Sequence, residues 1–128
     1  MCRRLFEFYP SLSSLLQHDA MNNNPNKLRQ FQSTFFKALS SPVRLAILDE
    51  LRSGEKTVTE IKSKLLLDSA NVSQQLAVLK AERIVTGERR GANIFYSCTD
   101  QAIFFLLDAS KVVFHNNLER MEKLLEST

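Results

Sequence analysis

The sequence contains little cysteine, glycine or proline, and each shortage excludes a class of protein. Its two cysteines, Cys2 and Cys98, lie far apart in the 128-residue chain, which excludes a disulfide framework and a clustered zinc site. Three glycines and three prolines leave little room for long loops, so we expect a mainly helical chain. No window approaches about 18 uninterrupted apolar residues, so we expect no membrane span. These shortages favour a small helical protein of a reducing cytoplasm.

Sequence motifs that would support an enzyme are also missing. There is no glycine-rich phosphate loop, no Ser-His-Asp or Cys-His set, and no carboxylate pair in a recognisable setting. What remains is the composition of one globular domain, with 44% hydrophobic and 24% charged residues. The formal net charge of +3 is compatible with a phosphate-bearing partner without demanding one. We expect a protein that is not an enzyme and needs no cofactor.

The N-terminal segment differs from the rest of the chain. A basic start followed by apolar residues resembles a signal peptide, but a glutamate, a proline and several serines interrupt it. Residues 1–20 are interpreted as a disordered extension or as sequence upstream of a start at Met21; a short docked helix is the alternative. We therefore expect residues 1–25 to form a flexible or poorly ordered extension and residues 26–128 to form one domain.

Apolar residues recur with helical spacing from Asn26 onward and predict three helices before a tight connection at Leu66-Leu67. The first ends before Ser41, which is placed to cap the second. The third begins at Thr57, whose side chain can form a capping box with Glu60. The apolar stripes of the first two helices are Leu28, Phe31, Phe35, Phe36 and Leu39, and Val43, Ile47, Leu48 and Leu51.

The stretch from Asp68 to Glu82 predicts a fourth helix with an unusual polar face. Val72, Leu76 and Leu79 form one buried stripe, and Asp68 is placed to cap the first turn. The opposite side carries short uncharged polar side chains, which donate and accept hydrogen bonds as base edges in a DNA major groove require. An ordinary solvated face is the alternative, but it would be richer in Lys and Glu. The candidate base-reading residues are Ser69, Asn71, Ser73, Gln74 and Gln75.

Beyond Glu82 the sequence predicts a β-hairpin. Residues 84–90 and 93–98 are rich in β-branched and aromatic residues, and Gly91-Ala92 between them supplies a turn. Arg89 and Arg90 are expected at the tip, where they would reach phosphates or the minor groove. A solvated hairpin tip is the alternative for this pair. A helix-turn-helix followed by such a hairpin is a winged helix.

Two further helices are expected at the C-terminal end. Asp100 is placed to cap a long helix from Ala102 to about His115, and a final amphipathic helix follows. The long helix is apolar over more than one face, which a small monomer could hardly bury. We therefore expect the first and the long penultimate helix to pack against a second copy. The predicted order is α-α-α-α-β-β-α-α, mainly α with a small β wing, in a two-fold dimer that suits a palindromic operator.

Residues from about Phe36 to Cys98 resemble the ArsR/SmtB family of small dimeric winged-helix repressors. The segments KALSSPVRLAILDEL, NVSQQLAVLKAERIV and GERRGANIFYS are similar to its second helix, recognition helix and wing. The resemblance implies a cytoplasmic homodimeric repressor bound to double-stranded operator DNA through the candidate residues given above. Two positions depart from the family pattern. Leu66 stands where glycine is usual in the turn, and Gln74 and Gln75 stand where a basic residue or His is frequent.

Members of the family commonly respond to metals, but both familiar metal sites lack ligands here. The thiolate site would fall on Thr57–Thr59, and hydroxyls are poor ligands for soft metals. The site on the long helix would fall on Ala102, Phe104, His115 and Leu118, of which only His115 can ligate. His115 and Glu119 are the residual pair on that helix, too few for a closed site. We therefore expect no bound metal.

Cys98 and Cys2 form a candidate redox pair, as in sulfur-sensing relatives. Such a pair needs its Cα atoms within about 7 Å of each other. A single packed strand cysteine is the favoured alternative for Cys98. The remaining alternatives are therefore release of the repressor by a non-metal effector, a redox change or a protein partner, or no effector at all. These alternatives stay open, as do the operator and the regulated genes.

The rival functional class is a winged-helix module that contacts proteins without specific DNA binding. Such a module would tolerate acidic residues on its recognition surface, whereas Glu88 is the only one near the wing tip and two arginines adjoin it. An RNA-binding module is disfavoured because the strands offer no exposed aromatic residues for base stacking. A DNA-binding regulator is the favoured interpretation.

Overall fold

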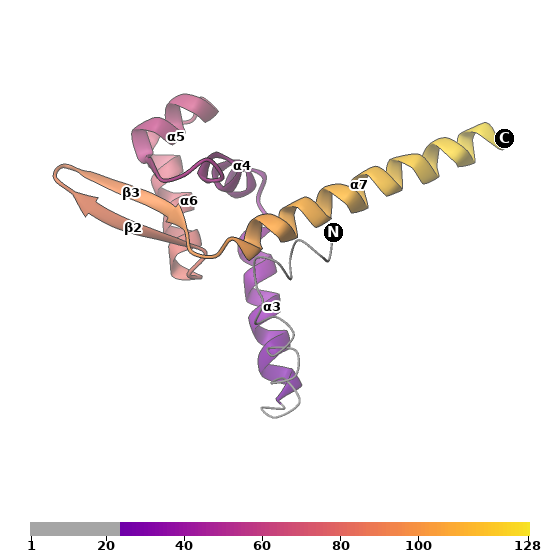
Figure 1. Ribbon diagram of the computed structural model, residues 1–128, viewed down its shortest axis with the longest axis horizontal. Coiled ribbons are helices and arrows are strands. Elements are labelled where there is room, and N and C mark those ends of the chain that lie inside the picture. The colour runs from indigo at the N-terminus through magenta and orange to yellow at the C-terminus, as the bar shows by residue number, and fades with distance from the viewer. Residues whose placement is uncertain (1–23) are drawn as a thin grey trace.

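Five helices and a small antiparallel sheet make up residues 24–128, the part of the chain that the computed structural model describes (Figure 1). In chain order the elements are α3 (Pro25–Leu39), α4 (Pro42–Leu51), β1 (Lys56–Thr57), α5 (Val58–Leu65), α6 (Ser69–Ala81), β2 (Val85–Arg90), β3 (Asn93–Cys98) and α7 (Ala102–Glu126). The expected extension lies outside the described residues except for its last two positions. These are ordered, with Asn24 as the N-cap of α3 and Pro25 as its first residue.

Three of the helices begin at the polar capping residues that the sequence predicts. Ser41, Thr57 and Asp68 each accept a backbone N–H from the first turn of α4, α5 and α6. The Thr57 cap is a complete capping box, because the Glu60 side chain also accepts the Thr57 N–H at 2.8 Å. Each cap satisfies N–H groups that the helix cannot pair internally, so the caps set the starting residues.

The hydrophobic core lies between α4, α5, α6 and the base of the hairpin. The three predicted stripe residues of α6, Val72, Leu76 and Leu79, are fully buried, which confirms the predicted inner face. They pack with apolar residues of the neighbouring elements, namely Ile47, Leu48, Leu51, Ile61, Ile84 and Val85. Because α6 buries one stripe so completely, its rotation about its own axis is fixed, and its outer face is fixed with it.

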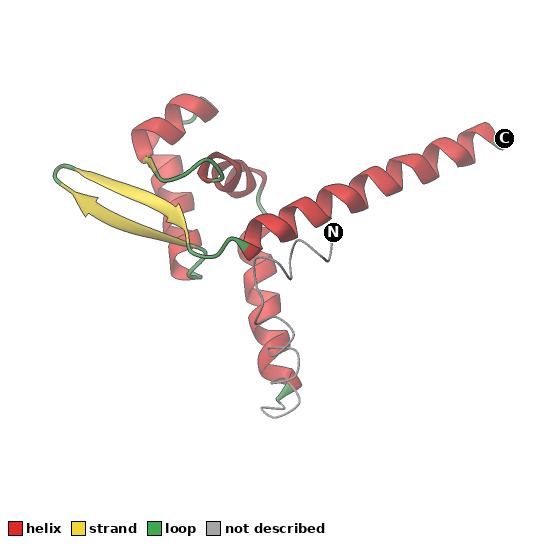
Figure 2. Cartoon of the chain, viewed as in Figure 1, coloured by secondary structure: helices red, strands yellow, loops and turns green. Residues whose placement is uncertain are grey.

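The strands form one antiparallel sheet in the order β1-β3-β2. The long hairpin of β2 and β3 extends away from the helices (Figure 2). The predicted hairpin is present, with Arg89 opposite Ile94 and Arg90 opposite Asn93. Its turn needs a positive φ, and Gly91 supplies it with a φ of 63°. The strand β1, only two residues long, was not expected because so short a segment carries no readable alternation.

The C-terminal region is one continuous helix, α7, where the sequence analysis expected two. No glycine or proline lies between Ala102 and Glu126, so nothing interrupts the hydrogen bonds of the helix near His115. The cap position falls on Gln101 rather than Asp100, although the Asp100 carboxylate still accepts the backbone N–H of Ala102 at 2.9 Å.

Both α3 and α7 project from the body of the molecule (Figure 1). Within residues 24–128, no other element covers their apolar faces. Every residue of α7 from Ala109 onward is exposed. On these two helices the exposed large apolar residues are Leu28, Phe31 and Phe36 of α3, and Val112, Val113, Phe114, Leu118, Met121, Leu124 and Leu125 of α7. Faces of this size are unusual on a protein that works as a single chain.

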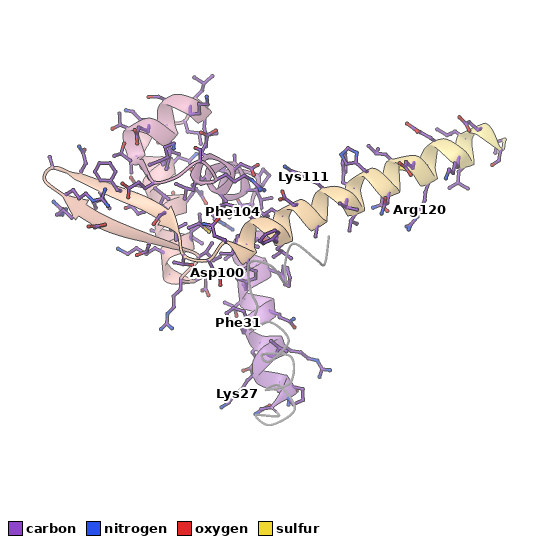
Figure 3. All side chains as sticks on the ribbon, viewed as in Figure 1. Lys27, Phe31, Asp100, Phe104, Lys111 and Arg120 are labelled. Atoms are coloured by element: carbon purple, nitrogen blue, oxygen red, sulfur yellow. The ribbon has the colours of Figure 1, made fainter. Side chains whose placement is uncertain are left out.

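The first turns of α7 pack against the body, where Ile103 and Leu106 contact the hydrophobic core. Arg52 at the end of α4 pairs with Asp108 at 2.9 Å and lies over the Phe104 ring, 5.1 Å from its centre. Figure 3 shows Phe104 at this junction, whereas Lys111 and Arg120 stand on the part of the helix that extends away from it. This junction sets the direction in which α7 leaves the domain.

Candidate nucleic-acid interface

The turn between α5 and α6 has the geometry of a helix-turn-helix, although Leu66 stands at its tightest point. Leu66 has a φ of 55° and a ψ of 43°, a left-handed conformation that glycine adopts without strain. Its side chain is 91% exposed, so packing does not compensate for the backbone conformation. Leu66 therefore adopts the left-handed conformation that favours glycine, and its side chain adds local strain.

The outer face of α6 carries three of the predicted base-reading residues. Ser69, Ser73 and Gln74 are exposed, and Gln74 lies opposite the buried stripe. Two exposed alanines, Ala70 and Ala77, flank Gln74 along the helix and were not singled out from the sequence. Small side chains let a helix approach a groove closely, and an alanine methyl suits contact with a thymine methyl.

The remaining two predicted base-reading residues, Asn71 and Gln75, lie on the flank of α6 that faces α4. Both are half-buried, and Gln75 Nε2 donates to Asn71 Oδ1 at 3.3 Å. Arg44 Nη1, from the first turn of α4, donates to Gln75 Oε1 at 2.9 Å. Both the oxygen and the nitrogen of the Gln75 amide are thus hydrogen-bonded to other side chains of the protein.

The two predicted wing arginines have different surroundings. Arg90 forms ion pairs with Glu55 and Glu88, the latter at 2.8 Å, and its guanidinium lies 4.9 Å from the centre of the Phe95 ring. Successive side chains on a strand point to opposite faces, so Arg89 points away from this cluster. Among the described residues, no carboxylate forms an ion pair with the exposed Arg89.

The charges around Arg90 stabilise one another. The hydrogen bond from Arg90 lowers the pKa of the Glu88 carboxyl, and Glu88 and Glu55 together raise the pKa of the Arg90 guanidinium. Glu88 adjoins the arginines in the sequence, whereas Glu55, which is not evident as a partner from the sequence, lies 35 positions before Arg90. No local pattern reveals such a long-range pair. Of the two wing arginines, Arg89 is therefore the one available to a phosphate.

Cys98, the member of the candidate redox pair that the structure describes, lies at the end of the hairpin opposite the Gly91 turn. Cys98 is half-buried at the end of β3, and burial raises the pKa of its thiol, which opposes the reactive thiolate form. Its expected partner, Cys2, lies outside the described residues. Within residues 24–128, no three His, Cys, Asp or Glu side chains gather in a way that could hold a metal ion. The same range contains no helix with the length and apolar content that a membrane crossing requires.

Comparison with known proteins gives the family. Residues 41–86 match the family model described as bacterial regulatory protein, arsR family. The chain is also 34% identical over 100 residues to Rv0081, an HTH-type transcriptional regulator of Mycobacterium tuberculosis, covering 77% of this chain and 88% of that protein. The chain belongs to the ArsR family. The crystal structure of Rv0081 matches this ArsR-family fold with a TM-score of 0.66, over 76% of this chain and 96% of that one.

Further relatives support the assignment to the ArsR family. The HTH-type transcriptional repressor SmtB of M. tuberculosis is 36% identical over 86 residues, 66% of this chain. The match spans 64% of that repressor's length. A homodimeric winged helix-turn-helix DNA-binding domain from Mycobacterium bovis, solved by NMR, matches with a TM-score of 0.67 and 28% identity, over 77% of this chain and 93% of that domain. The winged-helix fold predicted from the sequence is confirmed.

Proposed function

We propose that this protein is a homodimeric transcriptional repressor that acts by occupying a palindromic DNA operator in the cytoplasm. The observation that carries the proposal is the outer face of α6. It presents Ser69, Ser73 and Gln74 beside a hairpin whose Arg89 has no ion pair within the described residues. Uncharged polar groups suit base edges in the major groove, and a free arginine on the adjoining wing suits the phosphate backbone. Relatives described as transcriptional repressors support the same role.

Two copies of the chain are needed in this proposal. The uncovered apolar faces of α3 and α7 would be buried between the copies, which would place two α6 helices on one side of the assembly. Half-sites of a palindromic operator about 34 Å apart would then each receive one α6 helix. The homodimeric M. bovis domain supports this arrangement.

The releasing signal in this proposal is a non-metal effector or a redox change. A cavity of about 380 Å³ lies between α3, the connection from α6 to β2, and the start of α7. Its apolar lining comes from Phe31, Phe35, Ile84, Ile103 and Leu106. An apolar compound held there would touch both the end of the reading helix and the helices of the proposed dimer. The half-buried thiol of Cys98, whose pKa is raised, makes the redox route the weaker of the two.

Binding to the DNA upstream of the protein's own gene tests the proposal. We expect fluorescence anisotropy to give an affinity at least about 1,000-fold above random competitor DNA, with binding that weakens as salt is raised. Binding no tighter than competitor, on this DNA and on duplexes selected from random sequence, would refute specific recognition. No DNA binding even at low salt would favour the protein-interaction module instead. Once an operator is known, loss of binding in the same assay would reveal effectors among small molecules and oxidants.

A further inference from the structure

A chain of hydrogen bonds runs from the end of α3 to the reading helix α6. Arg44 Nε donates to the carbonyl oxygen of Ala38, in the last turn of α3, and Arg44 Nη1 donates to Gln75 Oε1 at 2.9 Å. Gln75 Nε2 in turn donates to Asn71 Oδ1 at 3.3 Å. We call Arg44, Gln75 and Asn71 the amide relay. All three side chains are half-buried, so an unsatisfied polar group in the relay would be costly.

The chemistry of these side chains fixes the direction of the amide relay. A guanidinium group has only donors, so Gln75 must turn its carbonyl oxygen toward Arg44. The Gln75 NH2 group then faces Asn71, which must accept with Oδ1. Asn71 Nδ2 therefore keeps its hydrogens for another partner, and none of the residues 24–128 accepts from it. The outward-facing group of Asn71 is a donor because Arg44 stands at the other end.

We propose that Arg44 is a positioning residue for operator recognition, which makes Asn71 a hydrogen-bond donor that selects a guanine. This inference rests on the proposed function and adds a specificity to it. Guanine offers two adjacent acceptors in the major groove, N7 and O6, which suit an NH2 group. The usual bidentate contact of asparagine with adenine needs Oδ1 and Nδ2 to face the base side by side, and here the hydrogen bond from Gln75 holds Oδ1 toward the protein.

The same relay gives a role to the arginine of the SSPVR segment, which the base-reading residues alone leave unexplained. Arg44 lies in the first turn of α4 and does not need to reach DNA, because its Nε and Nη1 atoms are both directed to protein acceptors. One of these acceptors, Ala38, belongs to the helix proposed to pack against the second copy. The relay thus connects the dimer helix α3 with the specificity of α6.

Reversing the direction of the relay tests the inference. In Gln75→Glu the carboxylate keeps the Arg44 contact but cannot donate, so Asn71 must rotate its amide, donate to Glu and present Oδ1 to DNA. We expect duplexes selected from random sequence to change at one position of each half-site. Wild type should select guanine there, and Gln75→Glu should select adenine or cytosine, whose amino groups donate. The guanine-to-adenine ratio should fall by about ten-fold or more.

Control variants distinguish the effect of reversing the amide relay from the effects of added charge and of misfolding. Ala81→Glu places the same charge at an exposed position of α6 outside the relay, and it should weaken binding without changing that base. Asn71→Ala should lose the preference at that position alone. Arg44→Lys keeps the charge but cannot hold both acceptors with the planar geometry of a guanidinium, so the preference should relax.

Two results would overturn the inference. The first is a guanine preference that persists in Gln75→Glu. The second is a preference that Asn71→Ala leaves unchanged. Thermal unfolding of each variant shows that the selection reports on folded protein, and Gln75→Glu, which keeps the guanidinium paired, decides the question if Arg44→Lys does not fold. Failure of the proposed function would look different, because wild type itself would then enrich no sequence.

Discussion

Leu66 holds a left-handed backbone conformation with its side chain 91% exposed, so the turn before α6 is strained without compensation. Leu66→Gly should remove a penalty of roughly 1–2 kcal/mol, less about 0.5–1 kcal/mol for the greater freedom of glycine in the unfolded chain. We expect a net gain of about 0.5–1 kcal/mol in the free energy of unfolding, measured by urea denaturation. Leu66→Ala keeps the strain and should give no such gain; an equal gain from alanine would show that the exposed leucine, not the backbone, is responsible.

The two wing arginines should differ in their effects on DNA binding. Arg89→Ala should weaken binding to operator and random DNA alike and reduce the salt slope by about 0.9, the value of one phosphate contact. Arg90→Ala should leave the slope close to wild type, because Glu55 and Glu88 already pair with that side chain. Anisotropy titrations over a salt series measure both. The reverse pattern, with the slope sensitive to Arg90 alone, would mean that the ion pairs open on DNA.

Gln74 should contribute to sequence preference rather than to general affinity. It lies opposite the buried stripe of α6, where the helix would meet the base edges. Gln74→Ala should cost about 1–3 kcal/mol on the preferred operator and change the order of preference among operator variants. Competition between operator variants measures the change. Equal losses on operator and on random DNA would contradict a base-reading role.

Among the secondary-structure elements, α5 should show a pH-dependent stability through its capping box. The backbone N–H of Thr57 donates to Glu60 and lowers the pKa of that carboxyl below its ordinary value. The carboxylate therefore stabilises the folded state fully above the unfolded pKa of about 4.3, and this stability is lost as the pH falls through the lower folded pKa. The stability difference between wild type and Glu60→Gln should accordingly shrink on acidification. Urea midpoints measured from neutral to acidic pH test this, and a constant difference would contradict it.

How far the sequence predicts the fold also differs from element to element. The starts of α4, α5 and α6 were predicted because Ser41, Thr57 and Asp68 act locally, on N–H groups within three residues. The sequence predicts two helices in place of α7 because apolar residues lie on more than one of its faces, and such a pattern is also expected of two successive amphipathic helices. The two-residue strand β1 forms because it pairs with β3, and its own sequence contains no strand pattern that would predict it.

In the candidate site too, features set by nearby residues could be predicted, whereas contacts between residues distant in the sequence could not. Ser69, Ser73 and Gln74 were placed on the exposed face from helical periodicity alone, and the structure has them exposed. The engagement of Gln75 with Arg44 spans 31 positions, and the pairing of Arg90 with Glu55 spans 35. Contacts between residues so far apart in the sequence arise from tertiary packing. The sequence therefore identifies the candidate residues but does not indicate which of them bond to other protein side chains.

In the molecule as a whole, α7 has the apolar pattern of a helix that packs against another helix. Phe114, Leu118, Met121 and Leu125 follow one another at spacings of four, three and four, which places them on one stripe. All four are exposed, and within residues 24–128 nothing covers them. Arg52 holds the base of α7 against α4, so the stripe is presented in one direction relative to α6. A partner on this stripe would therefore set the spacing of the two reading helices.

Disrupting the stripe should abolish operator binding by separating the copies. Leu118→Glu places a charge in the proposed interface of both copies, and we expect the dimer dissociation constant to rise by about 100-fold or more. Because Leu118 is 42% exposed in the single chain, the folding of each copy should be little affected. Asn116→Glu adds the same charge on the opposite side of α7 and should leave the dimer intact. Sedimentation and anisotropy on the same samples measure assembly and binding together. A monomeric Leu118→Glu protein with undiminished operator affinity would refute the dimeric mechanism, since a monomer reads only one half-site.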